Sequence, residues 1–191
     1  MSTRTLDAVT LAHALTALVP ECRAEPIEAI DQPTIVVPVS HIVAVATALR
    51  DAPGLRFPLL VDIVGVDFLP RDPRFELNYH LVSPDRDQPR RLRVKVRVPG
   101  DDPHVPTVTG VWPAANFLER EVWDLLGVRF DGHPDLRRLL TPDDWEGHPL
   151  RKDYPVQVKI PVKTDQPIQL TQEEFQANLQ KDRQARGGTG A

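Results

Sequence analysis

Leucines recur at every third or fourth position in the first part of the chain and predict an amphipathic helix over residues 5–19. Two short apolar runs follow, at 23–30 and 34–38, and the Asp-Gln-Pro between them is typical of a hairpin turn. A second helix is predicted over 41–51, with the hydroxyl of Ser40 as its N-cap. The predicted order so far is helix, two strands, helix.

The next elements are predicted to be strands because apolar and polar residues alternate in them. Residues 75–81 alternate throughout, and residues 91–98 place one leucine and three valines on one face and four basic residues on the other. The run at 61–69 is more apolar, and 107–111 is predicted to make one short extended piece. This pattern favours an antiparallel sheet with one face in water.

Proline positions divide the chain, because proline disrupts helix interiors and central strands. Proline makes up 20 of the 191 residues, about twice its usual share. A helix is predicted over 114–126, ended by Gly127, and beyond it prolines recur every six to eight residues. We therefore predict a compact domain over 1–130 and an extended segment over 131–191, which ends in a short helix at about 171–186.

Composition and motifs exclude several classes of function. A single cysteine, Cys22, rules out an internal disulfide and a cysteine-ligated iron–sulfur cluster, and is most simply a buried residue. Glycine-rich phosphate loops, metal-binding histidine pairs and a Gly-x-Ser-x-Gly motif are absent, and the net charge is −4. No run of 18 apolar residues and no signal peptide is found, so we expect a cytoplasmic protein.

Three acidic residues on the predicted helix over 114–126 could form an acid/base group, namely Glu119, Glu121 and Asp124. Arg120 precedes Asp124 by four residues, however, which is the spacing of an ordinary ion pair on a helix surface. We favour the surface pair.

The row of basic residues on the predicted strand could likewise bind phosphates or an anionic lipid surface. A solvated sheet face whose charges discourage aggregation is the simpler interpretation. The row consists of Arg91, Arg93, Lys95 and Arg97.

The segment 127–155 differs in kind from the rest of the chain. Gly-His-Pro occurs in it twice, at 132–134 and 147–149, and acids nearly balance its basic residues. Balanced charge disfavours nucleic acid, whereas Arg, Trp and Tyr among prolines are typical of a preorganised protein interface. A loop packed on its own domain explains the composition about equally well.

The longer string at 112–155 resembles the 30 kDa subunit family of the proton-pumping NADH:quinone oxidoreductase, respiratory complex I. EREVWDLLGVRFDGHPDLRR, at 119–138, resembles the family signature. VDIVGVDF at 61–68, RFELNYHL at 74–81 and RLRVKVRVP at 91–99 match in order and spacing. Val64-Gly65 departs from the family's usual Thr-Ala.

The resemblance implies an α+β fold: a two-layer domain with a mixed, mostly antiparallel five-stranded sheet, followed by an extended proline-rich C-terminal arm. It implies a non-catalytic subunit of the peripheral arm, on the cytoplasmic side of a bacterial inner membrane. We expect no cofactor in this chain, because FMN and iron–sulfur clusters belong to partner subunits. The chief partner would be the subunit that forms part of the quinone pocket, with cluster-bearing subunits nearby, no nucleic acid, and membrane contact only through the complex.

The resemblance also suggests which residues form the subunit interface, with Trp145 and Arg137 as its anchors, and it implies no catalytic, metal-binding or cofactor-binding residue. The expected interface residues are Glu119, Arg120, Glu121, Asp124, Gly127, Phe130, Gly132, His133, Pro134, Arg137, Arg138, Asp144, Trp145, Gly147, His148, Pro149, Arg151, Lys152, Asp153 and Tyr154.

Three alternatives remain at this point. The same fold could serve a related membrane-bound hydrogenase or a ferredoxin-dependent quinone reductase. A free-standing enzyme would need Glu121, Asp124 and His133 in one pocket. A nucleic-acid-binding module would use the basic row at 91–97.

Overall fold

The structure is a computed structural model, and its chain divides into two compact units, Met1–Val156 and Gln157–Ala191. The residues that it describes are 7–84, 90–155, 172–173, 176–177 and 180. The predicted extended arm from 156 to 170 lies outside them. Of the helix predicted at about 171–186, the described residues are helical and exposed.

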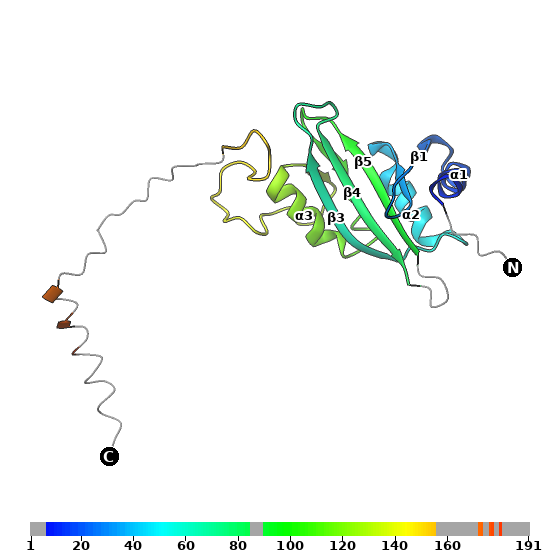
Figure 1. Cartoon of the computed structure of the whole chain (residues 1–191). Coiled ribbons are helices and arrows are strands. Elements are labelled where there is room, and N and C mark those ends of the chain that lie inside the picture. Colours follow the sequence, from blue (N-terminus) through cyan, green and yellow to red (C-terminus); the bar gives the residue numbers. More distant parts are fainter. Residues whose placement is uncertain (1–6, 85–89, 156–171, 174–175, 178–179, 181–191) are drawn as a thin grey trace, which may run out of the picture. The chain divides into compact units, whose positions relative to one another are not determined.

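The first unit is built on a mixed five-stranded sheet with the strand order β1-β2-β5-β4-β3 (Figure 1). Neighbouring strands are antiparallel except β2 and β5, which are parallel. The predicted α+β fold with a mixed, mostly antiparallel sheet is confirmed. The strands are β1 (Glu25–Ile27), β2 (Thr34–Val36), β3 (Leu59–Asp67), β4 (Phe75–Ser83) and β5 (Arg90–Val98).

Three α-helices and two short 3-10 turns accompany the sheet, and a small parallel pair of strands flanks the last helix. The helices are α1 (Ala8–Leu18), α2 (Ile42–Asp51) and α3 (Ala115–Leu126); the 3-10 turns are η1 (Pro20–Cys22) and η2 (Val39–His41); the paired strands are β6 (His104–Pro106) and β7 (Arg129–Asp131).

One face of the sheet holds the hydrophobic core. The alternation predicted in β4 and β5 places their apolar side chains on this face, where Tyr79 and Val94 form a cross-strand pair. All three α-helices contribute side chains to this core, and the buried Cys22 belongs to it as well. No helix in the described part of the chain is long and apolar enough to cross a membrane.

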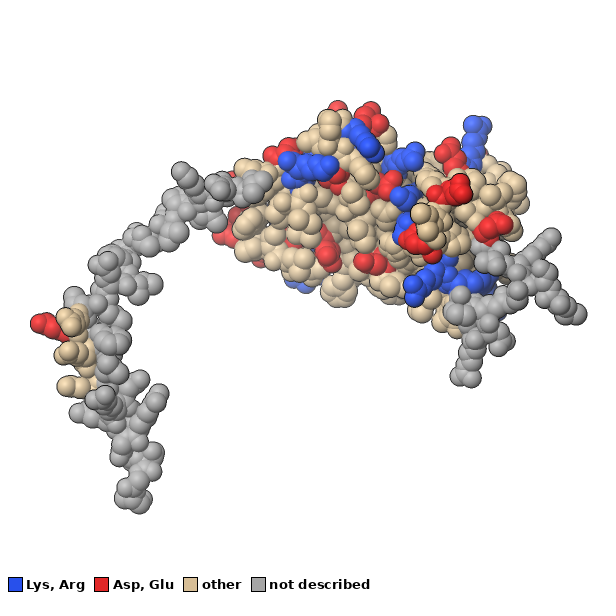
Figure 2. Space-filling view, viewed as in Figure 1, with Lys and Arg blue, Asp and Glu red and all other residues tan. Residues whose placement is uncertain are grey.

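The opposite face carries the basic row of β5, and acids partly neutralise it. Lys95 lies 2.7 Å from a Glu76 carboxylate oxygen, and Arg93 pairs with Asp31. Figure 2 shows acidic and basic side chains interspersed over much of the visible surface. This mixed charge fits the solvated sheet face better than a phosphate-binding surface.

Two local predictions were wrong. The Ser40 hydroxyl does not cap α2, because η2 runs directly into the helix and the Ser40 Oγ instead bonds the His41 ring at 2.9 Å. The short strand expected at 107–111 lies earlier, at β6, where it pairs with β7. Sequence periodicity misses three-residue strands, because alternation needs about four residues to be visible.

The predicted boundary after residue 130 falls inside the first unit, which extends to Val156. The residues from 131 to 155 have little regular structure, yet hydrogen bonds to α3 hold them against the domain. Proline spacing indicates where helices and strands end, but it carries no information about such contacts.

Candidate functional site

The candidate site is the loop that follows α3, residues 127–155, which we call the signature loop, together with the helix on which it packs. Its centre is the fully buried side chain of Asp124. One carboxylate oxygen accepts three successive backbone N–H groups, those of Leu139 (3.0 Å), Leu140 (2.7 Å) and Thr141 (2.9 Å). The other accepts the Arg138 guanidinium at 2.9 Å and the Thr141 hydroxyl.

These contacts keep Asp124 ionised. Burial alone would raise the pKa of this carboxyl, but the hydrogen bonds from Thr141, Leu140 and Leu139 outweigh it and hold the pKa well below its usual range. A buried charge is tolerated only when it is paired and fully hydrogen-bonded, as here. The charge on α3 therefore fixes the backbone of the signature loop at 138–141.

The signature loop also caps the C-terminus of α3. The last carbonyl groups of a helix lack intrahelical partners and carry partial negative charge, so cationic donors stabilise them. Here the Asp124 carbonyl accepts from Arg138 (3.0 Å) and His148 (2.9 Å), that of Leu125 from the Leu150 amide (2.9 Å), and that of Leu126 from Arg151 (2.6 Å).

Arg138 links the two halves of the loop. Besides Asp124, its guanidinium donates to the carbonyls of Trp145 (2.8 Å) and Gly147 (3.0 Å), and it lies 5.3 Å from the centre of the Trp123 ring. One arginine side chain thus satisfies acceptors on α3 and on the second part of the loop. Planar guanidinium groups suit such multiple, directed contacts.

The Gly-His-Pro repeat makes two similar turns on α3. Gly132 and Gly147 both have φ +79°, a left-handed conformation that favours glycine. His133 then donates from Nε2 to the Asn116 carbonyl at 3.0 Å, and His148 donates from Nδ1 to the Asp124 carbonyl at 2.9 Å. The two histidines therefore hold the loop to α3 through neutral ring N–H groups, and burial lowers the pKa of His148.

Glu119 fastens α3 to the chain that precedes it. Its buried carboxylate accepts the Val108 N–H at 2.8 Å and the Thr107 hydroxyl, and it lies 3.9 Å from the His133 ring. Burial raises the pKa of Glu119 to about 7, despite those two hydrogen bonds.

The expected surface pair on α3 is wrong. Arg120 is buried and donates to the carbonyls of Arg137 (3.2 Å) and Arg138 (2.9 Å), while Asp124 is buried beside Arg138. Of the three acidic side chains, only that of Glu121 is exposed. The helix-surface spacing misled because burial here depends on the loop that returns to cover α3.

A second anchor lies at the far end of the loop, and the sequence did not reveal it. Arg74 bonds the buried Asp67 at the end of β3 and also Asp153, each at 2.7 Å, and Asp67 accepts the Lys152 N–H at 2.8 Å. The Arg74 hydrogen bond holds the pKa of Asp67 well below its usual range. The only available signal was an acid that ends an apolar strand.

The remaining predicted interface residues divide by exposure. Phe130 and Gly127 are buried, and Tyr154 is half-buried with its hydroxyl donating to the Glu146 carbonyl at 3.2 Å. Arg137 is 70% exposed, and its guanidinium contacts Asp135. The other exposed residues of the prediction are Gly132, Pro134, Asp144, Gly147, Lys152 and Asp153, while Trp145 and Pro149 are half-buried.

The residues required by a free-standing enzyme have different neighbours. Asp124 is enclosed by residues 138–141, His133 faces Asn116 and Glu119, and Glu121 borders a hollow beside β3. No metal-ligand cluster occurs among the residues that the structure describes.

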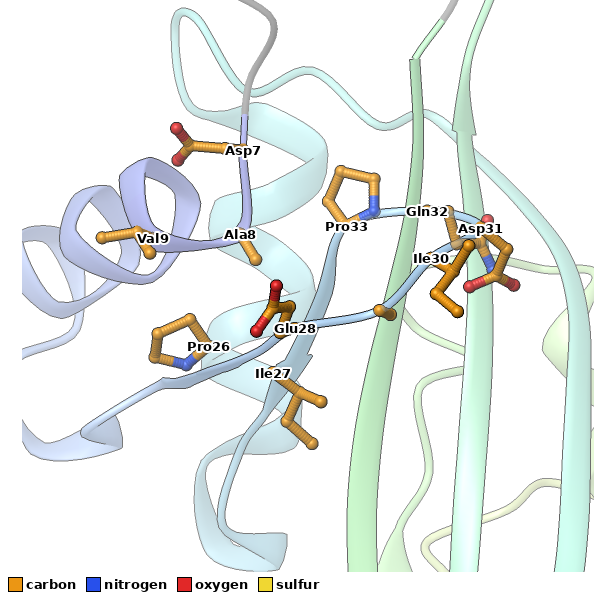
Figure 3. Close-up of a pocket in the computed structure, with 11 residues that line it drawn as sticks. Asp7, Ala8, Val9, Pro26, Ile27, Glu28, Ile30, Asp31, Gln32 and Pro33 are labelled. Carbon is orange, nitrogen blue, oxygen red and sulfur yellow. The ribbon is translucent and has the colours of Figure 1, made fainter.

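A hollow of about 600 Å³ lies elsewhere, between the start of α1 and the loop joining β1 to β2 (Figure 3). Its acidic lining residues are Asp7, Glu28 and Asp31, and Asp31 is already paired with Arg93. None of the predicted interface residues lines it. The chemistry of the predicted site is therefore that of the signature loop.

We predict that Gly127→Ala destabilises the domain more than Gly54→Ala. Both glycines have positive φ, +73° and +89°, so both alanines incur backbone strain of about 1 kcal/mol. A Cβ at Gly127 would collide with Arg151 and His148, whereas none of the described residues lies within 4 Å of one at Gly54. Urea denaturation should show a further loss of about 1 kcal/mol or more for Gly127→Ala. Equal losses would mean that the loop does not press on the end of α3.

We further predict that Glu119 makes stability depend on pH. Its native pKa of about 7 lies above the reference value of 4.5, so the native state holds a proton that the unfolded chain releases. The free energy of unfolding should therefore fall, by up to about 3 kcal/mol, as pH rises from 4.5 to 7. Glu119→Gln should remove this fall, and the exposed Glu121→Gln should retain it. His148 titrates in all three proteins, so parallel pH profiles would contradict the assignment.

Comparisons with known proteins agree with the resemblance. A family model described as the respiratory-chain NADH dehydrogenase, 30 Kd subunit, matches residues 35–159. An NADH-quinone oxidoreductase subunit of Roseiflexus sp. (strain RS-1) is 46% identical over 151 residues, 79% of this chain and 86% of that protein. The NADH-quinone oxidoreductase subunit of the same name from Moorella thermoacetica is 47% identical over 133 residues, 69% of this chain and 86% of that protein.

Two solved structures are also similar. A trypsin-resistant fragment (1–134) of Nqo5 is 36% identical, with a TM-score of 0.50, and the match covers 64% of this chain and 98% of the fragment. A chain of the membrane-bound sulfane sulfur reductase, an archaeal respiratory membrane complex, is 26% identical with a TM-score of 0.63, over 84% of this chain and 92% of that one. The family match spans the sheet, α3 and the signature loop, and the chain belongs to the 30 kDa subunit family of respiratory-chain NADH dehydrogenase.

Proposed function

We propose that this chain is a non-catalytic structural subunit in the peripheral arm of a proton-translocating NADH:quinone oxidoreductase. In this role it would bind no cofactor, and electrons would pass from NADH through FMN and iron–sulfur clusters of partner subunits to a quinone. The complex would couple this transfer to proton translocation, with this chain on the cytoplasmic side of a bacterial inner membrane. Family membership supports the assembly.

The observation that carries the proposal is the construction of the signature loop. Its buried polar groups bond α3 and each other, whereas Arg137 is fixed through its backbone carbonyl by Arg120 and directs its guanidinium outward. A loop that is already ordered loses little conformational entropy on binding. Its exposed arginine and half-buried Trp145 belong to the residue types that dominate protein interfaces.

We propose that the partner at this surface is the subunit that forms part of the quinone pocket, which we call the quinone-pocket subunit, with cluster-bearing subunits nearby. The related hydrogenase and ferredoxin-dependent machines are less well supported. Relatives at 46% and 47% identity are named as NADH-quinone oxidoreductase subunits, whereas the archaeal sulfur reductase chain is only 26% identical.

We predict that Arg137→Ala and Trp145→Ala each reduce co-purification of this chain with the quinone-pocket subunit. Loss of a buried aromatic anchor costs about 2–4 kcal/mol of binding. Arg91→Ala, which removes an exposed arginine from the sheet, is the matched control and should assemble normally. Circular dichroism should show all three variants folded. Unchanged assembly of both loop variants would contradict the proposed interface.

A further inference from the structure

The edge of the sheet formed by β3 has the features of a docking site. β3 is the last strand in the sheet order, and within the described ranges no strand pairs with its outer side. An edge strand of nine residues presents a row of unpaired N–H and C=O groups, because alternate residues direct these groups outward.

The side chains of β3 do not protect this edge. Three of them are large, apolar and exposed: Leu59 (48%), Val61 (57%) and Val64 (40%). Soluble proteins usually guard such an edge with lysine or proline, and β3 contains neither. The opposite edge, β1, differs: it has three residues, of which Pro26 lacks an N–H group.

An apolar hollow of about 140 Å³ lies beside this edge. Ile63 and Val64 of β3 line one side, and Leu125 of α3 with Leu150 of the signature loop line the other. Leu150 is 59% exposed, so the apolar surface continues from β3 onto the loop. Figure 2 shows the surface over β3 and α3 as largely uncharged.

The charged groups at this hollow are acidic. Glu121 is exposed, and no basic side chain of the described residues pairs with it. The carboxylate of Asp62 accepts the neighbouring Ile63 N–H at 2.8 Å. A segment that covers the hollow would therefore gain from a lysine or arginine opposite Glu121.

We propose that the outer edge of β3 receives an extended segment of a partner subunit, which pairs with it as a sixth strand. Alternate side chains of this segment would be apolar and pack on Leu125 and Leu150, and a basic residue would face Glu121. Main-chain hydrogen bonds and alternating pockets are how strand addition obtains affinity and specificity. The inference rests on the proposed function, since the segment belongs to another subunit of the complex.

Hydrogen exchange measured by mass spectrometry tests the pairing directly. The whole complex, purified through a tag on a different subunit, is compared with the isolated full-length chain. Backbone amides of 59–67 should exchange at least about tenfold more slowly in the complex, and those of β1 should change less. Unaltered exchange of β3 in a chain that has assembled would overturn the inference and leave the proposed function standing.

Matched substitutions supply the second arm. Val64→Lys places a charge on the proposed surface, and Val43→Lys places one on α2, where the valine is equally exposed (40% and 39%). Val64→Lys should reduce the amount of chain recovered with the complex about tenfold, which corresponds to about 1.4 kcal/mol, and Val43→Lys should leave it unchanged. Equal effects of the two variants would overturn the inference.

The remaining outcomes identify other occupants. Reduced assembly of Val64→Lys without protection of 59–67 would mean that a partner contacts only side chains, which contradicts strand addition. Protection that rises with the concentration of the isolated chain would identify a second copy as the occupant. Failure of the unmodified chain to associate with any other subunit would contradict both the inference and the proposed function.

Discussion

The arrangement of the signature loop depends on one buried negative charge. Asp124 lies in α3 with no exposed surface, and three successive backbone N–H groups and Arg138 surround its carboxylate. Without these partners a buried carboxylate would cost several kilocalories per mole. The helix therefore forms its stable environment only when residues 138–141 return to cover it.

Other contacts add to this constraint. The free carbonyl groups at the end of α3 attract Arg138, His148 and Arg151, and Arg74 ties the last part of the loop to Asp67. The buried polar groups of the family signature thus shape the loop, while outward-directed ones are left to meet a partner. Prolines in this segment restrict the unfolded chain and so favour the ordered loop further.

Most of the fold could be predicted from the sequence, because strict alternation and proline positions are local signals. The strands β4 and β5 and the end of α3 at Gly127 follow from them directly. The environment of Glu119 and Asp124 could not be predicted this way, since it depends on residues that return from later in the chain. The interface role of the exposed signature residues stays a prediction.

The central claim is that the isolated chain already holds the signature loop on α3 through Asp124. Amide hydrogen exchange of Leu139, Leu140 and Thr141, measured by NMR on the isolated full-length chain, tests it most directly. The account predicts slow exchange, comparable to that of amides inside α3, because all three N–H groups are bonded to a buried carboxylate. Exchange at the rate of an unstructured peptide would contradict it.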